Sequence, residues 1–298
     1  MRNRYDIGLR QSRHTVEDDS VRVLRRMGGD IAVPYLTNQL MQEQDKTKGT
    51  MKSFSRRRIL SAGSMLAATA AVAPALVREA RGEPTSKLKV VITGGHPGDP
   101  EYGCGGTISR LTELGHDAVL LYLNQGEPVE SAARLTGYRV EEAKKASAIL
   151  RARPAYVGQI DGNAVVDQLH YVQFREIVEK ENPNVVFTHW PIDNHADHRA
   201  ISMLVYDAWL HMRKKFSLFY YEVSNGEDTQ QFVPSDYVDI SASEPKKRLA
   251  CYAHASQAPD KFYALQDAVA RWRGIESGHT RAEAFTRHVQ SPGFALPV

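Results

Sequence analysis

Short apolar runs alternate with amphipathic segments along most of this chain, and this alternation restricts the possible folds more than any other feature. Buried strands are predicted at residues 88–92, 117–123, 155–157, 185–187 and 218–221. Helices are predicted at 138–150 and 170–180, after residue 198, and at 244–254 and 259–273. Strands separated by helices in this way form parallel sheets with right-handed crossovers. We therefore predict an α/β fold, with a mostly parallel sheet and helices on both faces.

Charge is distributed unevenly along the 298 residues. Residues 1–82 carry 15 Lys/Arg against 8 Asp/Glu, whereas residues 83–298 carry 23 Lys/Arg against 27 Asp/Glu. The larger part is mildly acidic, which argues against a basic face for nucleic acid. The two cysteines, Cys104 and Cys251, cannot form a disulfide framework. We expect Cys104 to be a small packing residue rather than a ligand.

The first 82 residues divide into two segments. Residues 1–50 are polar and charged, with weak periodicity that is compatible with a short helix or with disorder. Met51 resembles a natural start, so these residues could be an upstream extension from a mis-called start codon. In residues 51–82, Arg56 and Arg57 precede a weakly apolar, Ala-rich run, a pattern that resembles a twin-arginine export signal. We expect the twin-arginine machinery as a partner, cleavage near Ala73 or Gly82, and a periplasmic or extracellular protein.

A membrane anchor is the alternative for residues 59–77. The run approaches the length of a span, but it contains three hydroxyl side chains, a glycine and Pro74. These residues favour a cleaved signal over an anchor. The remaining residues, 83–298, are then predicted to form one domain.

His96 and Asp99 lie in a Pro/Gly-rich turn that directly follows the strand predicted at 88–92. Ligands of open α/β sheets bind at this carboxyl end of the strands. Imidazole and carboxylate are suitable zinc ligands, so this turn could supply part of a metal site. By itself, a His-Pro-x-Asp sequence in a loop is usually only a turn.

A second group of candidate ligands follows the strand predicted at 185–187. Asp193, His195, Asp197 and His198 lie between this strand and the next helix, on the same predicted sheet edge as the first turn. Two His and one Asp as protein ligands leave a fourth position for water, as in catalytic zinc sites. Only one His of this segment needs to bind metal, and Asp197 could hold the other in its charged form, able to donate to an oxyanion or a leaving amine. Alternatively, Asp197 could cap the helix while both histidines are solvated.

Glycines at 103, 105 and 106 raise the possibility of a nucleotide-binding oxidoreductase. However, no Gly-x-Gly-x-x-Gly sequence is present, and the preceding turn is acidic, which is unsuitable for a pyrophosphate.

These motifs resemble those of the PIG-L, or LmbE-like, zinc-dependent N-acetylglucosaminyl deacetylases. The resemblance extends over about residues 88–288. The matching segments are Gly95-His96-Pro97-x-Asp99-Pro100-Glu101, Gly103-Cys104-Gly105-Gly106-Thr107, Arg139-x-x-Glu142-Ala143, Asp161-Gly162, Pro191-x-Asp193-x-His195-x-Asp197-His198, Ala253-His254-x-Ser256-Gln257 and Ala282-Glu283-Ala284-Phe285.

The resemblance implies a Rossmann-like fold and hydrolysis of an N-acetyl group from an amino sugar. It assigns Zn²⁺ to His96, Asp99 and His198, and it makes His195 the acid and oxyanion partner, oriented by Asp197. We also assign substrate binding to Arg139 and Asp161.

Gly98 departs from the family pattern, which has Asp at this position as the general base. Glycine cannot accept a proton, and the loss of a general base typically costs about 10²–10⁴-fold in rate. Asp193 and Glu101 are the nearest replacements in the sequence, and we include Asp193 among the catalytic residues. The leading hypothesis is an exported zinc hydrolase, and the alternative is a metal-holding carbohydrate-binding pseudoenzyme. The sequence identifies neither the sugar nor the oligomeric state.

Overall fold

The computed structural model describes residues 86–128, 137–224 and 226–296. The chain divides into two units, Met1–Val77 and Arg78–Val298, and every described residue belongs to the second. The predicted extension (1–50) and signal segment (51–82) lie outside the described residues, so they stay predictions.

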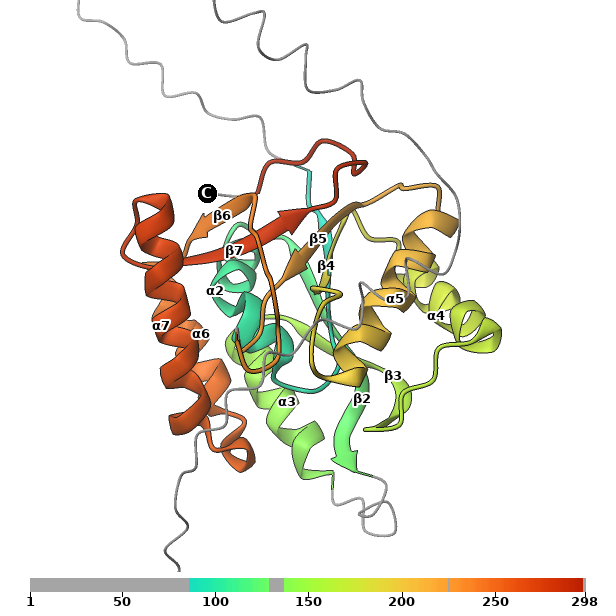
Figure 1. The fold of residues 1–298 in the computed structure, drawn as a ribbon, viewed down its shortest axis with the longest axis horizontal. Helices are drawn as coiled ribbons and strands as arrows, with labels where there is room; N and C mark the ends of the chain where they lie inside the picture. The colour runs from blue at the N-terminus through green and yellow to red at the C-terminus, as the bar shows by residue number, and fades with distance from the viewer. Residues whose placement is uncertain (1–85, 129–136, 225, 297–298) are drawn as a thin grey trace, which may run out of the picture. The chain divides into compact units, whose positions relative to one another are not determined.

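A seven-stranded sheet forms the centre of the described unit, in the order β3-β2-β1-β4-β5-β7-β6 (Figure 1). Its strands are β1 (Lys89–Gly94), β2 (Asp117–Pro128), β3 (Arg153–Asp161), β4 (Val185–His189), β5 (Ser217–Tyr221), β6 (Asp236–Asp239) and β7 (Ala282–Arg287). Strands β1 to β5 are parallel to one another, whereas β7 is antiparallel to both β5 and β6. The predicted α/β fold with a mostly parallel sheet is confirmed.

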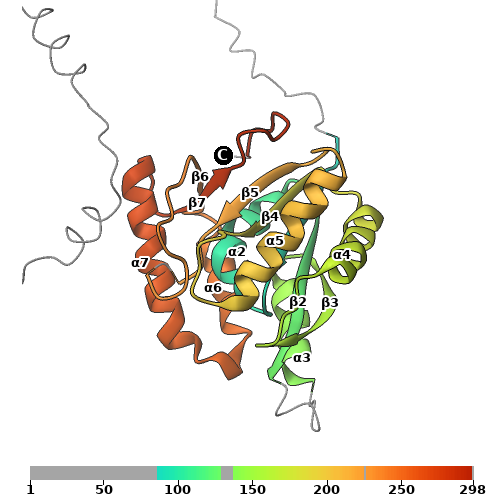
Figure 2. The same cartoon turned by 45° about the vertical axis from the view of Figure 1, so that its right-hand side comes forward.

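Helices cover both faces of the sheet (Figures 1 and 2). They are α2 (Asp99–Glu113), α3 (Tyr138–Ile149), α4 (Gln168–Glu181), α5 (Ala196–His211), α6 (Glu244–Tyr252) and α7 (Pro259–Ser277), with a short 3₁₀ turn at Ala255–Gln257. Alternate strand residues point to opposite faces. Val90 therefore packs in one core with residues of α2, α3, α6 and α7, whereas Val91 packs in the other with α4 and α5.

Two features of the sheet differ from the sequence prediction. The first is the edge formed by β6 and β7, which the hydrophobic pattern did not predict. Glu283 lies in β7 but is buried, because it pairs with Lys247 at 2.6 Å and accepts hydrogen bonds from two backbone N–H groups of α2. A charged residue at an inward-facing position interrupts the alternation of apolar and polar residues by which a strand is recognised in a sequence.

The second difference is the length of β2, which continues to Pro128, five residues beyond the end of the strand predicted at 117–123. The pairing with β3 shifts register between Tyr122 and Asn124 and again before Pro128, so this part of the strand is bulged. Gly126 has a φ of 71°, which glycine adopts without strain.

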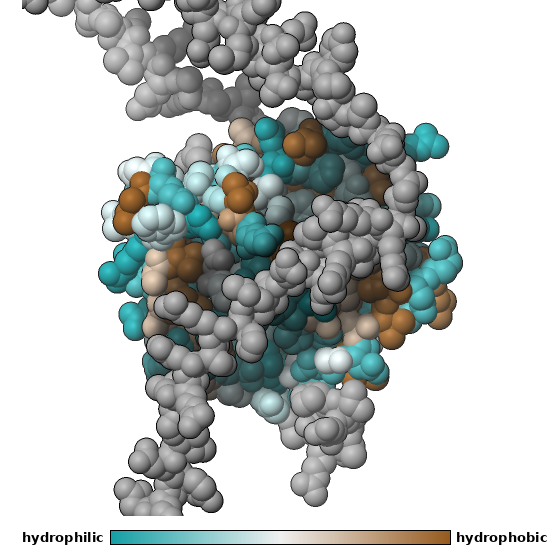
Figure 3. Space-filling model, viewed as in Figure 1, coloured by the Kyte–Doolittle hydropathy of each residue, from teal (hydrophilic) through white to brown (hydrophobic). Residues whose placement is uncertain are grey.

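The face drawn in Figure 3 is mostly hydrophilic, with apolar patches where Figure 1 places α4 and α5. Exposed apolar side chains of these helices include Leu169, Val172, Met203, Tyr206 and Leu210. In the part of the chain that the structure describes, no helix is both long enough and apolar enough to cross a membrane.

Candidate metal centre and active site

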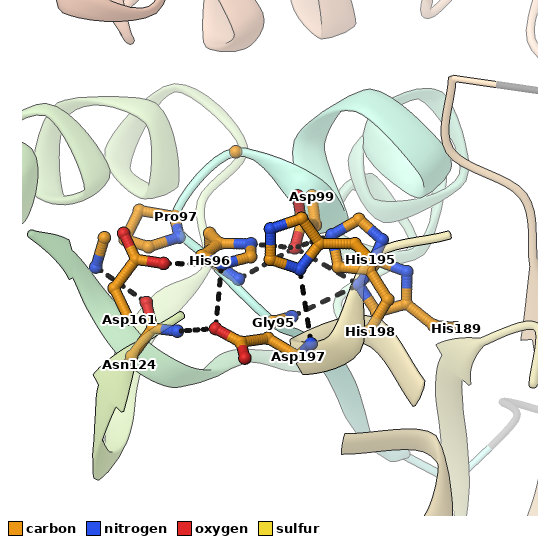
Figure 4. A network of polar contacts seen from close by, with 12 residues as sticks. Gly95, His96, Pro97, Asp99, Asn124, Asp161, His189, His195, Asp197 and His198 are labelled. Atoms are coloured by element: carbon orange, nitrogen blue, oxygen red, sulfur yellow. Dashed lines mark hydrogen bonds and ion pairs between the residues drawn. The ribbon is translucent and has the colours of Figure 1, made fainter. Parts of the chain in front are cut away.

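The two predicted motifs meet at one edge of the sheet. Strands β1 and β4 are adjacent and parallel, with Ile92 paired to Phe187, so the segments that follow them leave the sheet side by side. Figure 4 shows His96 and Asp99 from the first segment close to His195 and His198 from the second. They border a cavity of about 360 Å³, whose other lining residues include Pro97, Gly98, Tyr102, Arg139, Asp161, Asp228, His254 and Phe262.

One oxygen of Asp99 lies between the two histidines that we predicted as metal ligands. Its Oδ2 atom is 3.3 Å from His96 Nδ1 and 3.3 Å from His198 Nε2. Zinc bonds to nitrogen and oxygen are about 2.0–2.2 Å long, so ligand atoms of a tetrahedral zinc site are about 3.3 Å apart. The two distances to Asp99 therefore match those of a zinc site. Among the described residues, three groups have ligand atoms that all lie within 4.8 Å of one another: His96, His195 and His198; Asp99, His189 and His198; and His96, Asp161 and Asp197. The predicted set is not one of these groups, but each of its members belongs to at least one of them.

The other ring nitrogen of each histidine faces a carboxylate. His198 Nδ1 is 3.1 Å from Asp193 Oδ1, and His96 Nε2 is 3.0 Å from Asp161 and 3.1 Å from Asp197. Metal-binding histidines usually have such an outer partner, which fixes the ring and increases its basicity. The sequence had suggested Asp161 for substrate binding, and the structure places it both on the cavity wall and against His96.

The charges of this cluster favour a bound cation. Burial alone would lower the pKa of His96, but Asp161, Asp197 and Asp99 outweigh it and raise the pKa well above its usual value. Likewise, Asp99 and Asp193 overcome burial and raise the pKa of His198 to about 9. The pKa of Asp99 is lowered well below its usual value: burial opposes this change, but His198, His189 and His96 outweigh it. The carboxylates of Asp99, Asp161, Asp193 and Asp197 gather here, and a metal ion can neutralise their negative charge.

Asp193, which we predicted as a replacement base, has both oxygens engaged. Oδ1 accepts a hydrogen bond from the His195 backbone N–H and contacts His198, and Oδ2 accepts one from Thr229 Oγ1. The side chain is fully buried and is absent from the cavity lining. This position suits the orientation of His198 rather than proton transfer with a substrate.

His195 caps the N-terminus of α5, where its Nδ1 accepts a hydrogen bond from the Asp197 backbone N–H. The neutral ring therefore carries its proton on Nε2. We predicted that Asp197 would hold His195 in its charged form. The charge of Asp197 does favour that form, but other effects outweigh it. Burial and the charges of His96 and His198 lower the pKa of His195, and the Asp197 carboxylate contacts His96, Asn124 and Gly162 instead.

His189 belongs to the cluster, although the sequence analysis assigned it no role. Its Nε2 atom lies 3.2 Å from Asp99 Oδ2, and its ring stacks on that of His198 at a centroid distance of 4.0 Å. Its pKa is lowered to about 4 by burial and by the charge of His198. The available signal was its position two residues after the strand predicted at 185–187, just before the second motif.

Gly98 has a φ of 115°, a backbone conformation that favours glycine. A Cβ atom here would lie 3.8 Å from the rings of His254 and Tyr102, so space does not require glycine. Glu101, the other suggested base, is fully buried, and its oxygens accept hydrogen bonds from the Gly98 N–H and the Tyr122 hydroxyl and contact His254 Nε2. It holds His254 in place rather than facing the cavity.

Arg139 reaches the cavity from the start of α3. Its guanidinium donates to the carbonyl oxygens of Pro97 at 2.6 Å and Gly126 at 3.2 Å, and so it links the first motif to the bulged end of β2. Its Nε atom is buried and has no hydrogen-bond partner among the described residues. The structure therefore brings all eight predicted site residues together at this sheet edge, with Asp193 and Asp197 behind the cavity wall.

Comparison with known proteins supports the resemblance read from the motifs. Residues 91–209 match the family model described as PIG-L, GlcNAc-PI de-N-acetylase. Over 218 residues the chain is 28% identical to a diacetylchitobiose deacetylase from Thermococcus kodakarensis, and the match covers 65% of this chain and 81% of that protein.

Solved structures share the fold. The conserved protein TT1542 from Thermus thermophilus superposes with a TM-score of 0.61 at 27% identity, over 70% of this chain and 97% of that one. The N,N′-diacetylchitobiose deacetylase from Pyrococcus horikoshii has a TM-score of 0.59 at 22% identity, over 69% and 85%. GalB, a 4-carboxy-2-hydroxymuconate hydratase from Pseudomonas putida, has a TM-score of 0.61 at 20% identity, over 70% and 100%. The same fold therefore occurs in a hydratase, so the fold alone does not define the reaction of this protein, which depends on the residues of its site.

Proposed function

Because residues 91–209 match the PIG-L family model, we propose that the protein is a zinc-dependent hydrolase that removes an acetyl group from an N-acetylated amino sugar. One observation carries the proposal: on the cavity wall, Asp99 lies 3.3 Å from a ring nitrogen of both His96 and His198, and the other ring nitrogen of each histidine faces a second carboxylate. The relative from Thermococcus kodakarensis, named a diacetylchitobiose deacetylase, supports the substrate class.

A bound zinc ion would polarise the acetyl carbonyl and lower the pKa of water. The chain itself positions both groups. Asp193 and Asp161 orient the two histidine ligands, and neutral His195 can donate a hydrogen bond from Nε2 to the oxygen that becomes negative during the reaction. Among the described residues that line the cavity, Arg139 is the one Arg or Lys, and its guanidinium can bind the polar groups of a sugar.

The competing proposal is a metal-holding protein that binds a carbohydrate without hydrolysing it, and Gly98 is the observation that favours it. The cavity residues fit both proposals, because both need the ligands. The difference lies in whether a proton acceptor stands near the attacking water.

Metal analysis combined with a substrate panel tests the proposal. We expect about one zinc per chain and acetate release from N-acetylated sugars, with N,N′-diacetylchitobiose as the first to be tried. A chelator should abolish the release, and added zinc should restore it. A zinc-loaded, folded protein that binds these sugars but releases no acetate would favour the binding function instead.

We also propose that residues 51–82 direct export through the twin-arginine pathway, on the basis of Arg56 and Arg57 before an apolar run. Replacing both with lysine should retain the full-length protein in the cytoplasm. Arg58→Lys is the matched control and should leave export unchanged. Export of the double variant would contradict the proposed route, and a full-length membrane-bound wild type would indicate an anchor.

A further inference from the structure

The cavity contains one carboxylate that the metal centre does not use. Three of the described carboxylates line it: Asp99, Asp161 and Asp228. Asp99 faces the histidine ligands, and Asp161 contacts His96. Within residues 86–128, 137–224 and 226–296, no hydrogen bond or ion pair engages the Asp228 carboxylate. It can therefore gain or lose a proton without breaking a contact of the folded protein.

Backbone contacts fix the position of Asp228 beside the second motif. Its carbonyl oxygen accepts a hydrogen bond from the Asn194 N–H at 2.9 Å, and its own N–H donates to the Ser224 oxygen at 2.9 Å. The next residue, Thr229, donates to Asp193, which in turn contacts His198. The segment that orients a metal ligand thus also holds Asp228 next to the catalytic motif.

The surroundings of Asp228 suit a proton acceptor. Burial raises the pKa of its carboxyl, and the nearby Asp193 and Asp99 add to this effect. The charges of His198 and His195 act in the opposite direction but do not cancel the rise. A carboxylate whose pKa is raised towards the working pH is a more effective general base than an ordinary aspartate.

On the premise that the protein is a deacetylase, we propose that Asp228 is its general base, in the role that a carboxylate at position 98 would otherwise have. The carboxylate removes one proton from the attacking water while the water oxygen bonds to the acetyl carbon. It then gives this proton to the amide nitrogen as the carbon–nitrogen bond breaks. The free amine leaves, the second water proton leaves with acetic acid, which ionises in solution, and Asp228 returns to its charged form.

The test is steady-state kinetics of Asp228→Asn in the zinc-loaded protein. We expect kcat to fall about 10²–10⁴-fold, with little change in KM and with unchanged zinc content. Glu227→Gln is the matched control, because it removes the same charge from the neighbouring, exposed side chain. Its kinetics should equal those of the wild type.

Two further measurements separate proton transfer from substrate binding. When kcat of the wild type is measured against pH, it should fall on the acid side with an apparent pKa above the usual value for aspartate. This fall (the acid limb of the profile) should be absent in Asp228→Asn. Added formate should restore part of the activity of Asp228→Ala, because a small carboxylate can enter the vacated space. If Asp228→Asn fails to fold, Asp228→Glu should retain activity with a shifted acid limb, and an unshifted limb contradicts the proposal.

The outcomes also distinguish this proposal from the deacetylase function. If Asp228→Asn has the kcat of the wild type, or differs from it only by a higher KM, Asp228 is not the general base. The deacetylase function is then unaffected. A wild-type protein that releases no acetate from any N-acetylated sugar overturns the deacetylase function, and the base with it.

Discussion

Two groups of side chains share the cavity, and they differ in how their polar atoms are used. In the centre group, His96, Asp99 and His198, both nitrogens of each imidazole face a carboxylate. The open group consists of Arg139, Asp228 and His254. Among the described residues, Arg139 Nε, His254 Nδ1 and the Asp228 carboxylate have no hydrogen-bond partner. The first pattern is that of a fixed metal site, and the second is that of groups available to a ligand.

The difference has an energetic meaning. A buried polar atom without a partner costs about 1–3 kcal/mol, so a folded protein normally satisfies it. The unpaired Nε of Arg139 and Nδ1 of His254 lie in side chains that line the cavity. Such unsatisfied groups indicate that a substrate, or ordered water, completes the open group, whereas the centre group is complete except for its metal.

The largest effect should come from removing a member of the centre group. In His198→Ala, two ligands remain, and we expect loss of stoichiometric zinc and a fall in acetate release of more than about 10³-fold. Zinc content and activity are measured together, with His211→Ala on the same helix as the control for loss of an imidazole. Retention of one zinc per chain in His198→Ala would show that the ligand assignment is wrong.

A smaller effect should follow removal of a carboxylate behind the centre group. Asp193→Asn keeps the size of the side chain but weakens its contact with His198, so zinc affinity should fall roughly 10–100-fold. At saturating zinc most of the activity should return. Asp207→Asn, which removes the same charge from a partly exposed pair with Arg175, should leave zinc affinity unchanged. If Asp193→Asn instead loses activity about 10²-fold at full zinc occupancy, Asp193 takes part in proton transfer.

The open group should affect substrate binding rather than metal binding. Arg139→Lys keeps the charge but cannot bridge the Pro97 and Gly126 carbonyl oxygens in the same way. Loss of one hydrogen bond to a charged group costs about 1.5 kcal/mol, so KM should rise roughly tenfold with zinc content unchanged. The exposed Arg151→Lys is the control. An unchanged KM would exclude Arg139 from substrate binding.

The centre group was predictable from the sequence, and the open group only in part. His96, Asp99 and His198 follow two predicted strands, and the rule that parallel strands end at the same edge brings them together. Asp228 lies in a loop that carries no periodic pattern. Its place at the cavity depends on tertiary hydrogen bonds, one from the Asn194 N–H to its own carbonyl oxygen and one from the neighbouring Thr229 to Asp193. His189 was not predicted for another reason. The hydrophobic pattern does not distinguish a histidine of a functional site from one that packs at the end of a buried strand.

The fold shows the same contrast. The parallel core was predictable because its strands are continuous apolar runs covered on both faces. The β6–β7 edge was not, because Glu283 points inward and is neutralised by Lys247 from a distant helix. The role of Asp193 also could not be decided, because the sequence does not show that Thr229 and His198 occupy both of its oxygens.

The smallest change in rate should come from Gly98→Asp, which introduces the carboxylate that the resemblance to the PIG-L family implies at this position. With Asp228 as the base, we expect no gain in kcat. The positive φ of Gly98 is unfavourable for any residue with a Cβ atom, so the variant should also lose about 1–2 kcal/mol of stability. Gly98→Ala is the matched control, because it has the same backbone strain without a carboxylate. Both variants should unfold at similar denaturant concentrations and have similar kcat values. If folded, zinc-loaded Gly98→Asp exceeds Gly98→Ala tenfold or more in kcat, position 98 is the productive place for a base, and Asp228 belongs to substrate binding instead.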